Sequence, residues 1–321
     1  SYLFRIVLYH ERMRTVTNYY LLNLAIADSS NSILNTGFTW HYMIYYNWRW
    51  GSTYCHVNNF MGVAPITASV FTMIVMSIDR YWAVVHPLRK RPGKRATVTV
   101  IITIWVIVLT ISTPAALASH LEMETHFFIY NKTVHERVVC LSDNFIDGDS
   151  QTSSLFFWYT NLLFVVQYAL PLSVLSYTYW KVGGVLRKKE SVGDIRHYRS
   201  IAAKRKASKM LALVVFIFMV VWLPYHSYFL YESFVAHSIN LDPHKLYINV
   251  YFLGMTYSIF NPIIYYFMNK RFRMGFKYVF RFLPCVSVDQ MEYECQLGSC
   301  PRGPSLPSYH STSHTHTIAN T

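Results

Sequence analysis

The chain has 321 residues, of which 53% are hydrophobic and only 14% are charged, and its net charge is +13. An ordinary soluble domain is about a quarter charged, so this composition argues against a cytosolic protein and indicates a membrane protein. Five cysteines are too few for a disulfide-rich scaffold, and the lack of a nucleophile–base pair, metal motif or phosphate loop argues against an enzyme or a cofactor.

Long apolar segments make up most of the chain. The stub at residues 1–9 is too short to span a bilayer, and we expect it to be the inner part of a first helix whose outer part is missing. Six longer segments are of spanning length and almost free of charge: Asn18–Tyr46, Val57–Ile78, Thr97–Ala118, Leu155–Trp180, Met210–Tyr231 and Leu246–Met268. Together they predict an all-α membrane protein, a seven-transmembrane helix bundle over residues 1–282.

The charged residues orient these helices. Lysine and arginine gather in residues 89–95, 187–209 and 270–281, and positive loops face the cytoplasm. We therefore expect a plasma-membrane protein with these loops and the C-terminus inside the cell. The loop predicted to lie outside carries the acids Glu122, Glu124, Glu136, Asp143, Asp147 and Asp149. This separation makes the positive charge a topology signal and argues against a nucleic-acid footprint.

Two features of the predicted outer side suit an oxidising compartment. Asn131, followed by Lys132 and Thr133, is an N-glycosylation acceptor. Cys55 lies at the outer end of the helix that contains the Val57–Ile78 span, and Cys140 lies in the acidic loop. A disulfide between them is the natural pairing, with two free thiols as the alternative. Such a bridge would hold the loop over the mouth of the bundle.

Charged residues stand at two places in or next to the spans. Asp79-Arg80-Tyr81 follows the apolar run that ends at Ile78, at the expected membrane–water interface. By itself it could be an interfacial ion pair that ends a helix. Asp28 lies inside a span, where an ionisable residue is costly and marks either a functional site or a hydrogen-bonded structural one.

Prolines interrupt three of the later spans. Asn261-Pro262 precedes Tyr265 by a few residues in the last span, where the proline bends the helix and Asn261 offers Asp28 a partner. Trp222 stands two residues before a proline in the preceding span, and Pro171 interrupts the span before that. Each proline alone could be an ordinary kink, since membrane helices tolerate them.

In combination these motifs resemble the rhodopsin-like G-protein-coupled receptors, over residues 1 to about 285. Within that superfamily the chain is most similar to tachykinin receptors. The supporting stretches are residues 12–20, 83–88, 137–140, 222–229 and 271–277. The run Pro224-Tyr225-His226 is the most telling, because it lines the ligand floor in that family.

The resemblance implies a receptor that binds a short amidated neuropeptide from outside. Amide side chains suit a peptide carboxamide because they both donate and accept hydrogen bonds. The pocket implied by position consists of Asn35, Tyr42, Asn58, Asn59, Tyr225, His226, Phe229, Tyr247 and Tyr251. Plain interhelical packing is the alternative for several of these aromatics. Gly62 stands where amine receptors carry an aspartate, so a small amine is disfavoured.

The resemblance also implies how the signal crosses the membrane. Trp222 and Phe218 would repack against Pro171 and Val70, and Arg80 would then leave Asp79 to meet Tyr179 and Tyr265 beside a heterotrimeric G protein. A phospholipase C and calcium pathway is implied. Lys204 stands where some relatives carry an acid that restrains Arg80, so restraint here is expected to rest on Asp79.

A sodium site of the family matches Asp28, Ser69, Ser258 and Asn261 in this chain. The match has one departure, because Tyr257 stands where many members have a small polar residue. The bulk of Tyr257 argues against sodium.

The last part of the chain is predicted to be cytoplasmic. Residues 270–282 alternate basic and aromatic residues at helical spacing, which predicts an amphipathic helix on the membrane surface. Cys285 follows as a palmitoylation candidate, with a free thiol as the alternative. The polar tail, residues 283–321, is expected to be disordered and to be read by kinases and arrestin.

Two rival functions remain on sequence grounds. A receptor for another neuropeptide class, neuropeptide Y-like or RFamide, would share the same motifs. A multi-pass transporter is more remote, because transporters more often show internal repeats and several midplane charges, whereas Asp28 is the only such charge here.

Overall fold

The computed structural model describes residues 14–86, 89, 92–128, 133–150, 152–189, 195–235, 243–284, 286–288 and 293. Its elements are α2 (Val16–Asn31), η2 (Ser32–Thr36), α3 (Gly37–Tyr45), α4 (Gly51–Val85), α5 (Lys94–Leu117), β1 (Ser119–Phe128), β2 (Thr133–Ser142), α6 (Ser154–Phe164), η3 (Val165–Ala169), α7 (Leu170–Lys189), α8 (Ile195–Val235), α9 (Pro243–Met255), α10 (Tyr257–Met268) and α11 (Lys270–Val279).

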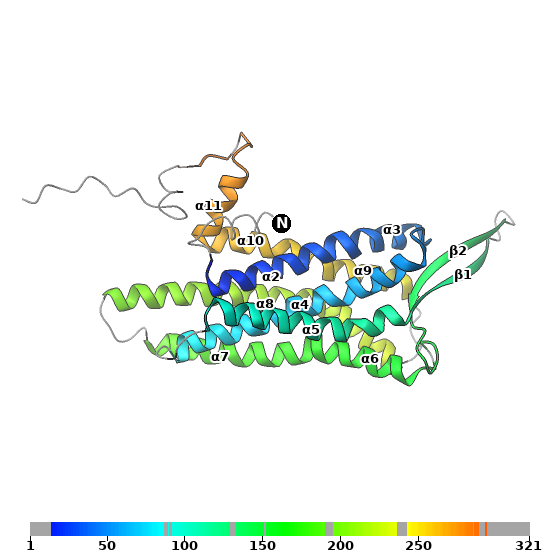
Figure 1. Cartoon of the computed structure of the whole chain (residues 1–321), viewed down its shortest axis with the longest axis horizontal. Coiled ribbons are helices and arrows are strands. Elements are labelled where there is room, and N and C mark those ends of the chain that lie inside the picture. The colour runs from blue at the N-terminus through cyan, green and yellow to red at the C-terminus, as the bar shows by residue number, and fades with distance from the viewer. Residues whose placement is uncertain are drawn as a thin grey trace, which may run out of the picture.

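The long helices run along the long axis of the molecule, the β1–β2 hairpin projects from one end, and α11 lies at the opposite end (Figure 1). Within the described ranges, four helical stretches are long and apolar enough to cross a membrane: Gly51–Val85, Lys94–Leu117, Ser154–Arg187 and Arg205–Tyr231. The six predicted spans are all helical or nearly so in the structure. The predicted first-helix stub lies outside the described residues.

Two helix boundaries differ from the prediction. α4 continues through Asp79 and Arg80 to Val85, so this pair lies inside a helix and not at its end. α11 begins after Asn269, whose side chain accepts a hydrogen bond from Arg271 N at 3.1 Å, and it ends at Val279 instead of 282. The apolar face of α11 packs on the bundle, where Phe272 is fully buried and its ring lies 5.9 Å from that of Tyr265.

Prolines lie close to two of the irregular turns. Pro171 has no backbone N–H to donate into the preceding turn, and the π-helical segment η3 lies just before it. The last span is likewise divided, because α9 ends at Met255 and α10 begins at Tyr257, a few residues before Pro262. The η3 turn buries one polar and one aromatic side chain, Gln167 and Tyr168.

The antiparallel β1–β2 hairpin is an addition to the all-α prediction. Strand β1 pairs with β2 in a register that sets Leu121 opposite Cys140. The hairpin is also held to the loop after α3, where Trp48 N donates to Val138 O at 2.7 Å and Val138 N donates to Asn47 Oδ1 at 3.1 Å.

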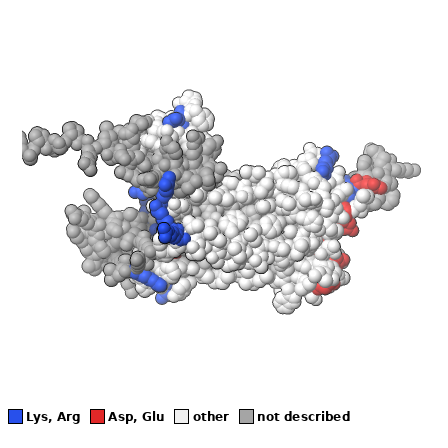
Figure 2. Space-filling view, in the orientation of Figure 1, with Lys and Arg blue, Asp and Glu red and all other residues white. Residues whose placement is uncertain are grey.

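Basic and acidic residues lie at opposite ends of the described surface, as the charges of the predicted loops indicate. Lysine and arginine gather at the end that carries α11, and acids gather at the end that carries the hairpin (Figure 2). We call these the basic end and the hairpin end. The side of the bundle between them is white in Figure 2, as expected for a surface that faces lipid.

Candidate functional site

The Asp79–Arg80 pair lies on α4 at the basic end. Arg80 Nη2 donates to Asp79 Oδ2 at 2.6 Å, and the two side chains are only 12–13% exposed. The same nitrogen donates to Thr17 Oγ1 in the first turn of α2. Two helices therefore supply oxygens to one guanidinium. Sequence reasoning missed Thr17, because no motif marks it.

Two further residues of the predicted switch lie near this pair in the structure. The Tyr81 ring lies 5.9 Å from that of His86, just past the end of α4. Tyr179 is partly buried and packs against the main core cluster, which also contains Tyr265.

Asp28 on α2 is held by two neighbouring helices. Ser69 Oγ on α4 donates to Asp28 Oδ1 at 3.1 Å, and Asn261 Nδ2 on α10 donates to Asp28 Oδ2 at 2.6 Å. The expected partnership of Asp28 with Asn261 is present. Pro262 directly follows Asn261, so the bend of the last span and this polar contact occur at one point.

Trp222 and Phe218 form a buried pair of aromatic rings on α8. Their ring centroids are 5.9 Å apart, and the Phe218 ring meets Tyr257 edge-on at 5.0 Å. Gly254 on α9 leaves room for the indole, because a Cβ there would lie 3.2 Å from two of its ring carbons. Val70 is fully buried in the same cluster.

A buried polar cluster joins α2–η2–α3, α4 and α9 toward the hairpin end. Tyr251 Oη donates to Asn35 Oδ1 at 2.5 Å, and Asn35 Nδ2 donates to the Asn58 carbonyl at 2.9 Å. Asn58 Nδ2 donates to Thr39 Oγ1 at 3.2 Å. The structure thus brings together three predicted pocket residues and adds Thr39, which lies four residues after Asn35 on the same helical face.

Aromatic rings continue from this cluster toward α8. Tyr247 lies 5.9 Å from Tyr251 and 6.0 Å from Phe229, whose ring is 4.9 Å from Tyr225. The predicted aromatic residues therefore form one connected group.

His226 stands at the deep side of that group. Its ring lies 4.9 Å from Tyr168 on η3 and 6.1 Å from Trp222. His226 is 4% exposed, and its Nε2 has no hydrogen-bond partner among the described residues. Tyr168 was not predicted, because the π-helical turn that points it inward leaves no mark in the apolar pattern.

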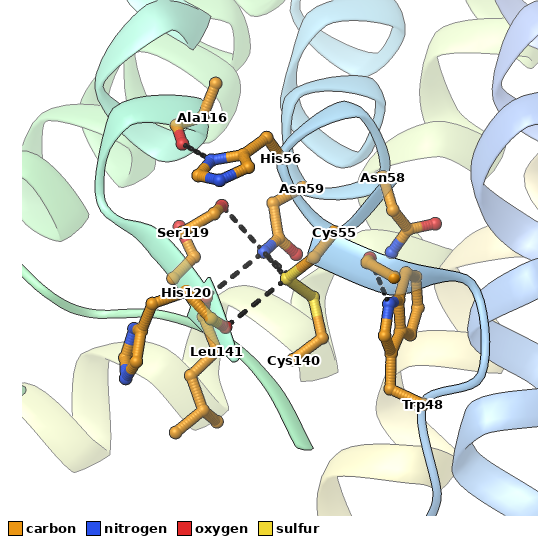
Figure 3. The surroundings of a disulfide bond; sticks show 12 residues. Trp48, Cys55, His56, Asn58, Asn59, Ala116, Ser119, His120, Cys140 and Leu141 are labelled. Carbon is orange, nitrogen blue, oxygen red and sulfur yellow. Dashed lines mark hydrogen bonds between the residues drawn. A yellow bond between two sulfur atoms is a disulfide. The ribbon is translucent and has the colours of Figure 1, made fainter. Parts of the chain in front are cut away.

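The hairpin is fixed to α4 by the predicted disulfide between Cys55 and Cys140 (Figure 3). Asn59, one turn further along α4, donates from Nδ2 to Ser119 Oγ at 2.9 Å and to Leu141 O at 3.4 Å. Asn59 was expected to line the ligand pocket, but its amide nitrogen points into the base of the hairpin. Its hydrogen bonds make it an anchor of the hairpin.

Tyr42 also belongs to the base of the hairpin. It lies in a buried cluster with the disulfide, 5.7 Å from Trp48, and Tyr247 packs against that cluster from α9. Tyr42 therefore links the predicted pocket to the hairpin.

The loop after the hairpin caps α6 with an acid. Asp147 accepts hydrogen bonds from the Ser153 hydroxyl and from Leu155 N, the latter at 3.0 Å. These two bonds hold the pKa of Asp147 below its ordinary value, because both stabilise the ionised form.

The candidate modification sites Asn131 and Cys285 lie outside the described residues. Where the structure is described, no group of three or more His, Cys, Asp or Glu side chains could hold a metal ion.

Comparison with known proteins finds a matching family and several similar receptors. Residues 2–265 match the family described as 7 transmembrane receptor (rhodopsin family). The chain is 38% identical over 287 residues to the Tachykinin-like peptides receptor 99D of Drosophila melanogaster, covering 88% of this chain and 54% of that protein. It is 39% identical over 278 residues to the Tachykinin-like peptides receptor 86C of the same species, covering 85% of this chain and 53% of that protein. It is 37% identical over 292 residues to the human Substance-P receptor, covering 89% of this chain and 68% of that protein. The chain thus spans about half the length of the two Drosophila proteins.

Proposed function

Because this chain belongs to the rhodopsin family of seven-transmembrane receptors, we propose that it is a receptor for an amidated neuropeptide of the tachykinin type. In this proposal the hairpin end faces outward at the plasma membrane, and the basic end faces the cytoplasm and a heterotrimeric G protein. The names of the relatives support the ligand class, and the separation of charge between the two ends supports the orientation.

The observation that carries the proposal is the polar cluster of Asn35, Asn58 and Tyr251 beside the aromatic group around His226. A terminal carboxamide needs both donors and acceptors, and the cluster offers both. These groups already bond one another, so a peptide amide would have to replace those bonds one for one. The aromatic group would receive the hydrophobic side chains that precede the amide.

The charge of the hairpin end suggests a cationic ligand. Glu122, Glu124 and the partly exposed Asp143 lie on or beside the hairpin and would raise the local concentration of a positive peptide. We therefore propose that peptides ending in an Arg-amide are more potent than peptides ending in a Met-amide. Clearly greater potency of Met-amide peptides on this receptor would refute that choice.

Transmission to the G protein is proposed to follow the switch implied by the family. A peptide that binds one packing of α8 more tightly than the other shifts the equilibrium toward that packing. Phe218 and Trp222 would repack, and Arg80 would exchange Asp79 and Thr17 for Tyr179 and Tyr265. Receptor kinases and arrestin are proposed as later partners of the C-terminal tail.

Calcium release in transfected cells tests this function. Amidated peptides of the tachykinin, neuropeptide Y-like and RFamide classes are applied in turn. We expect a response to tachykinin-type peptides alone, and a loss of potency of at least about tenfold in His226→Ala, which removes a buried ring contact. Trp158→Ala is the matched control, because that aromatic ring on α6 is 68% exposed.

Surface labelling must show equal amounts of each variant. A response confined to another peptide class would keep the receptor assignment and refute the tachykinin ligand. An unchanged potency in His226→Ala would refute the pocket.

A further inference from the structure

The β1–β2 hairpin carries two histidines that its register sets directly opposite each other. His126 of β1 pairs with His135 of β2, two steps along the ladder from the pairing of Phe128 with Thr133. Residues along a strand alternate between the two faces of a sheet, and residues paired across the ladder share one face. Glu124, two residues before His126, belongs to that face as well. The register therefore places two histidines and a glutamate on one face of one hairpin.

The spacing of these three positions fits a single metal ion. Opposite residues of an antiparallel ladder have Cβ atoms about 4.5–5.5 Å apart, and diagonal neighbours such as Glu124 and His135 lie about 7–8 Å apart, within reach of long side chains. Zinc binds imidazole nitrogen at about 2.0–2.1 Å, so two nitrogens on one tetrahedral ion are about 3.4 Å apart. Two imidazoles that start from opposite positions of a ladder can converge to that distance.

The chemistry of the three residues selects zinc. Imidazole is the commonest metal ligand in proteins and suits zinc, whereas magnesium and calcium prefer oxygen. A carboxylate from Glu124 makes a third protein ligand and leaves the fourth position of a tetrahedral ion to water. Arg137 is paired with Glu124 in the register, and its guanidinium carbon lies 5.6 Å from the centre of the Tyr46 ring. This cation is thus held against the loop that follows α3.

The position of the pair makes it accessible to ions. The hairpin projects from the end of the bundle, and Met123, three residues before His126, is 66% exposed (Figure 1). The absence of metal-binding groups among the described side chains does not include this pair, because His126 and His135 are described through their strand positions alone.

We propose that His126 and His135, together with Glu124, form a zinc site that ties β1 to β2. The ion would bridge the outer part of the ladder, whereas the Cys55–Cys140 disulfide fixes its base. The hairpin would then be closed at both ends. In the orientation proposed above, zinc would reach the site from the extracellular fluid, but binding itself does not depend on that orientation.

Hydrogen exchange of the purified receptor in detergent tests the site without any peptide. Exchange of the hairpin amides is measured by mass spectrometry over a series of zinc chloride concentrations, and again after addition of a chelator. An ion that binds only the closed ladder slows exchange by a factor of 1 + [Zn]/Kd. We expect about 100-fold slower exchange beside the histidines at 100 times the midpoint concentration. Magnesium chloride is the control ion and should change nothing.

Substitutions locate the ion. His126→Ala and His135→Ala should each raise the zinc midpoint at least about tenfold, because even the partners of metal ligands cost about 10–100-fold in affinity when removed. The double variant Val134→His/His135→Val keeps the composition but moves the histidine to the other face, opposite Phe127, and should lose the protection. His120→Ala changes a histidine of the same strand roughly 20 Å away and should bind zinc as the unmodified receptor does.

Two results would overturn the proposal. Equal exchange of the hairpin amides with and without zinc would show that the two histidines are surface residues without an ion. Protection that persists with an unchanged midpoint in His126→Ala, or in the variant with the moved histidine, would place the zinc elsewhere on the chain. Neither result involves a peptide or a G protein, so both are separate from the test of the proposed function.

Discussion

The second hydrogen bond of Arg80 leads to a prediction about activity in the absence of ligand. Arg80 Nη2 donates to Asp79 and also to Thr17 Oγ1, and in the proposed switch it leaves both. Thr17→Val removes the hydroxyl and keeps the shape of the side chain. We expect the variant to signal without peptide, because the resting state alone loses a bond.

The magnitude follows from the environment of the pair. A hydrogen bond to a charged group contributes about 1.5–3 kcal/mol, and the ion pair with Asp79 remains, so the lower value applies. Since 1.4 kcal/mol is a factor of ten, the ratio of active to resting receptor should rise roughly tenfold. A receptor that is about 1% active without ligand would then be about 10% active.

The assay is the accumulation of inositol phosphates in unstimulated cells, divided by the amount of receptor at the surface. Thr17→Ser keeps the hydroxyl and serves as the negative control, because its basal signalling should equal that of the unmodified receptor. Asp79→Asn serves as the positive control, because it weakens the other restraint. If Asp79→Asn raises basal signalling and Thr17→Val does not, the hydrogen bond to Thr17 contributes nothing to the resting state and the reasoning is wrong.

Two more predictions concern the core and the loop. Gly254→Ala would place a Cβ 3.2 Å from the Trp222 ring, so we expect the free energy of unfolding to fall by about 1–3 kcal/mol. The measurement is the melting temperature. The control is Gly93→Ala, where an added Cβ would meet no atom within 4 Å, and Gly254→Ala should melt at a lower temperature than this control. The bonds that lower the pKa of Asp147 stabilise the start of α6 at any pH above the ordinary carboxyl value of about 3.9 and are lost as the pH falls through the lower folded value. Hydrogen exchange at Leu155, corrected for its intrinsic rate, should stay slow from pH 7 to 5 and speed up only in stronger acid, whereas Asp147→Ala should exchange fast throughout.

The sequence predicted those parts of the structure that depend on composition along the chain. Spanning segments follow from runs of apolar residues, and the contact between Asp28 and Asn261 follows because buried polar groups must find partners. The Cys55–Cys140 bridge follows from the side of the membrane on which both residues were placed.

Contacts that depend on the rotation and depth of neighbouring helices could not be predicted. Thr17, Thr39 and Asn31 are ordinary polar residues in the sequence, and their partners lie on other helices. Asn59 was assigned to the pocket by its position, but its side chain turns toward the hairpin because Ser119 and Leu141 present acceptors there.

The length of α8 has a mechanical consequence. This helix runs without a break from Ile195 to Val235, with Pro224 well toward one end. At 1.5 Å per residue, the part from Ile195 to Pro224 measures about 43 Å. A tilt of about 10° around Pro224 would move the far end by roughly 8 Å, whereas side chains near the fulcrum would shift by about 1 Å. The helix is thus a lever with a long arm at the basic end. In the proposed switch, a small rearrangement around Trp222 would therefore be enough to open a wide gap at that end.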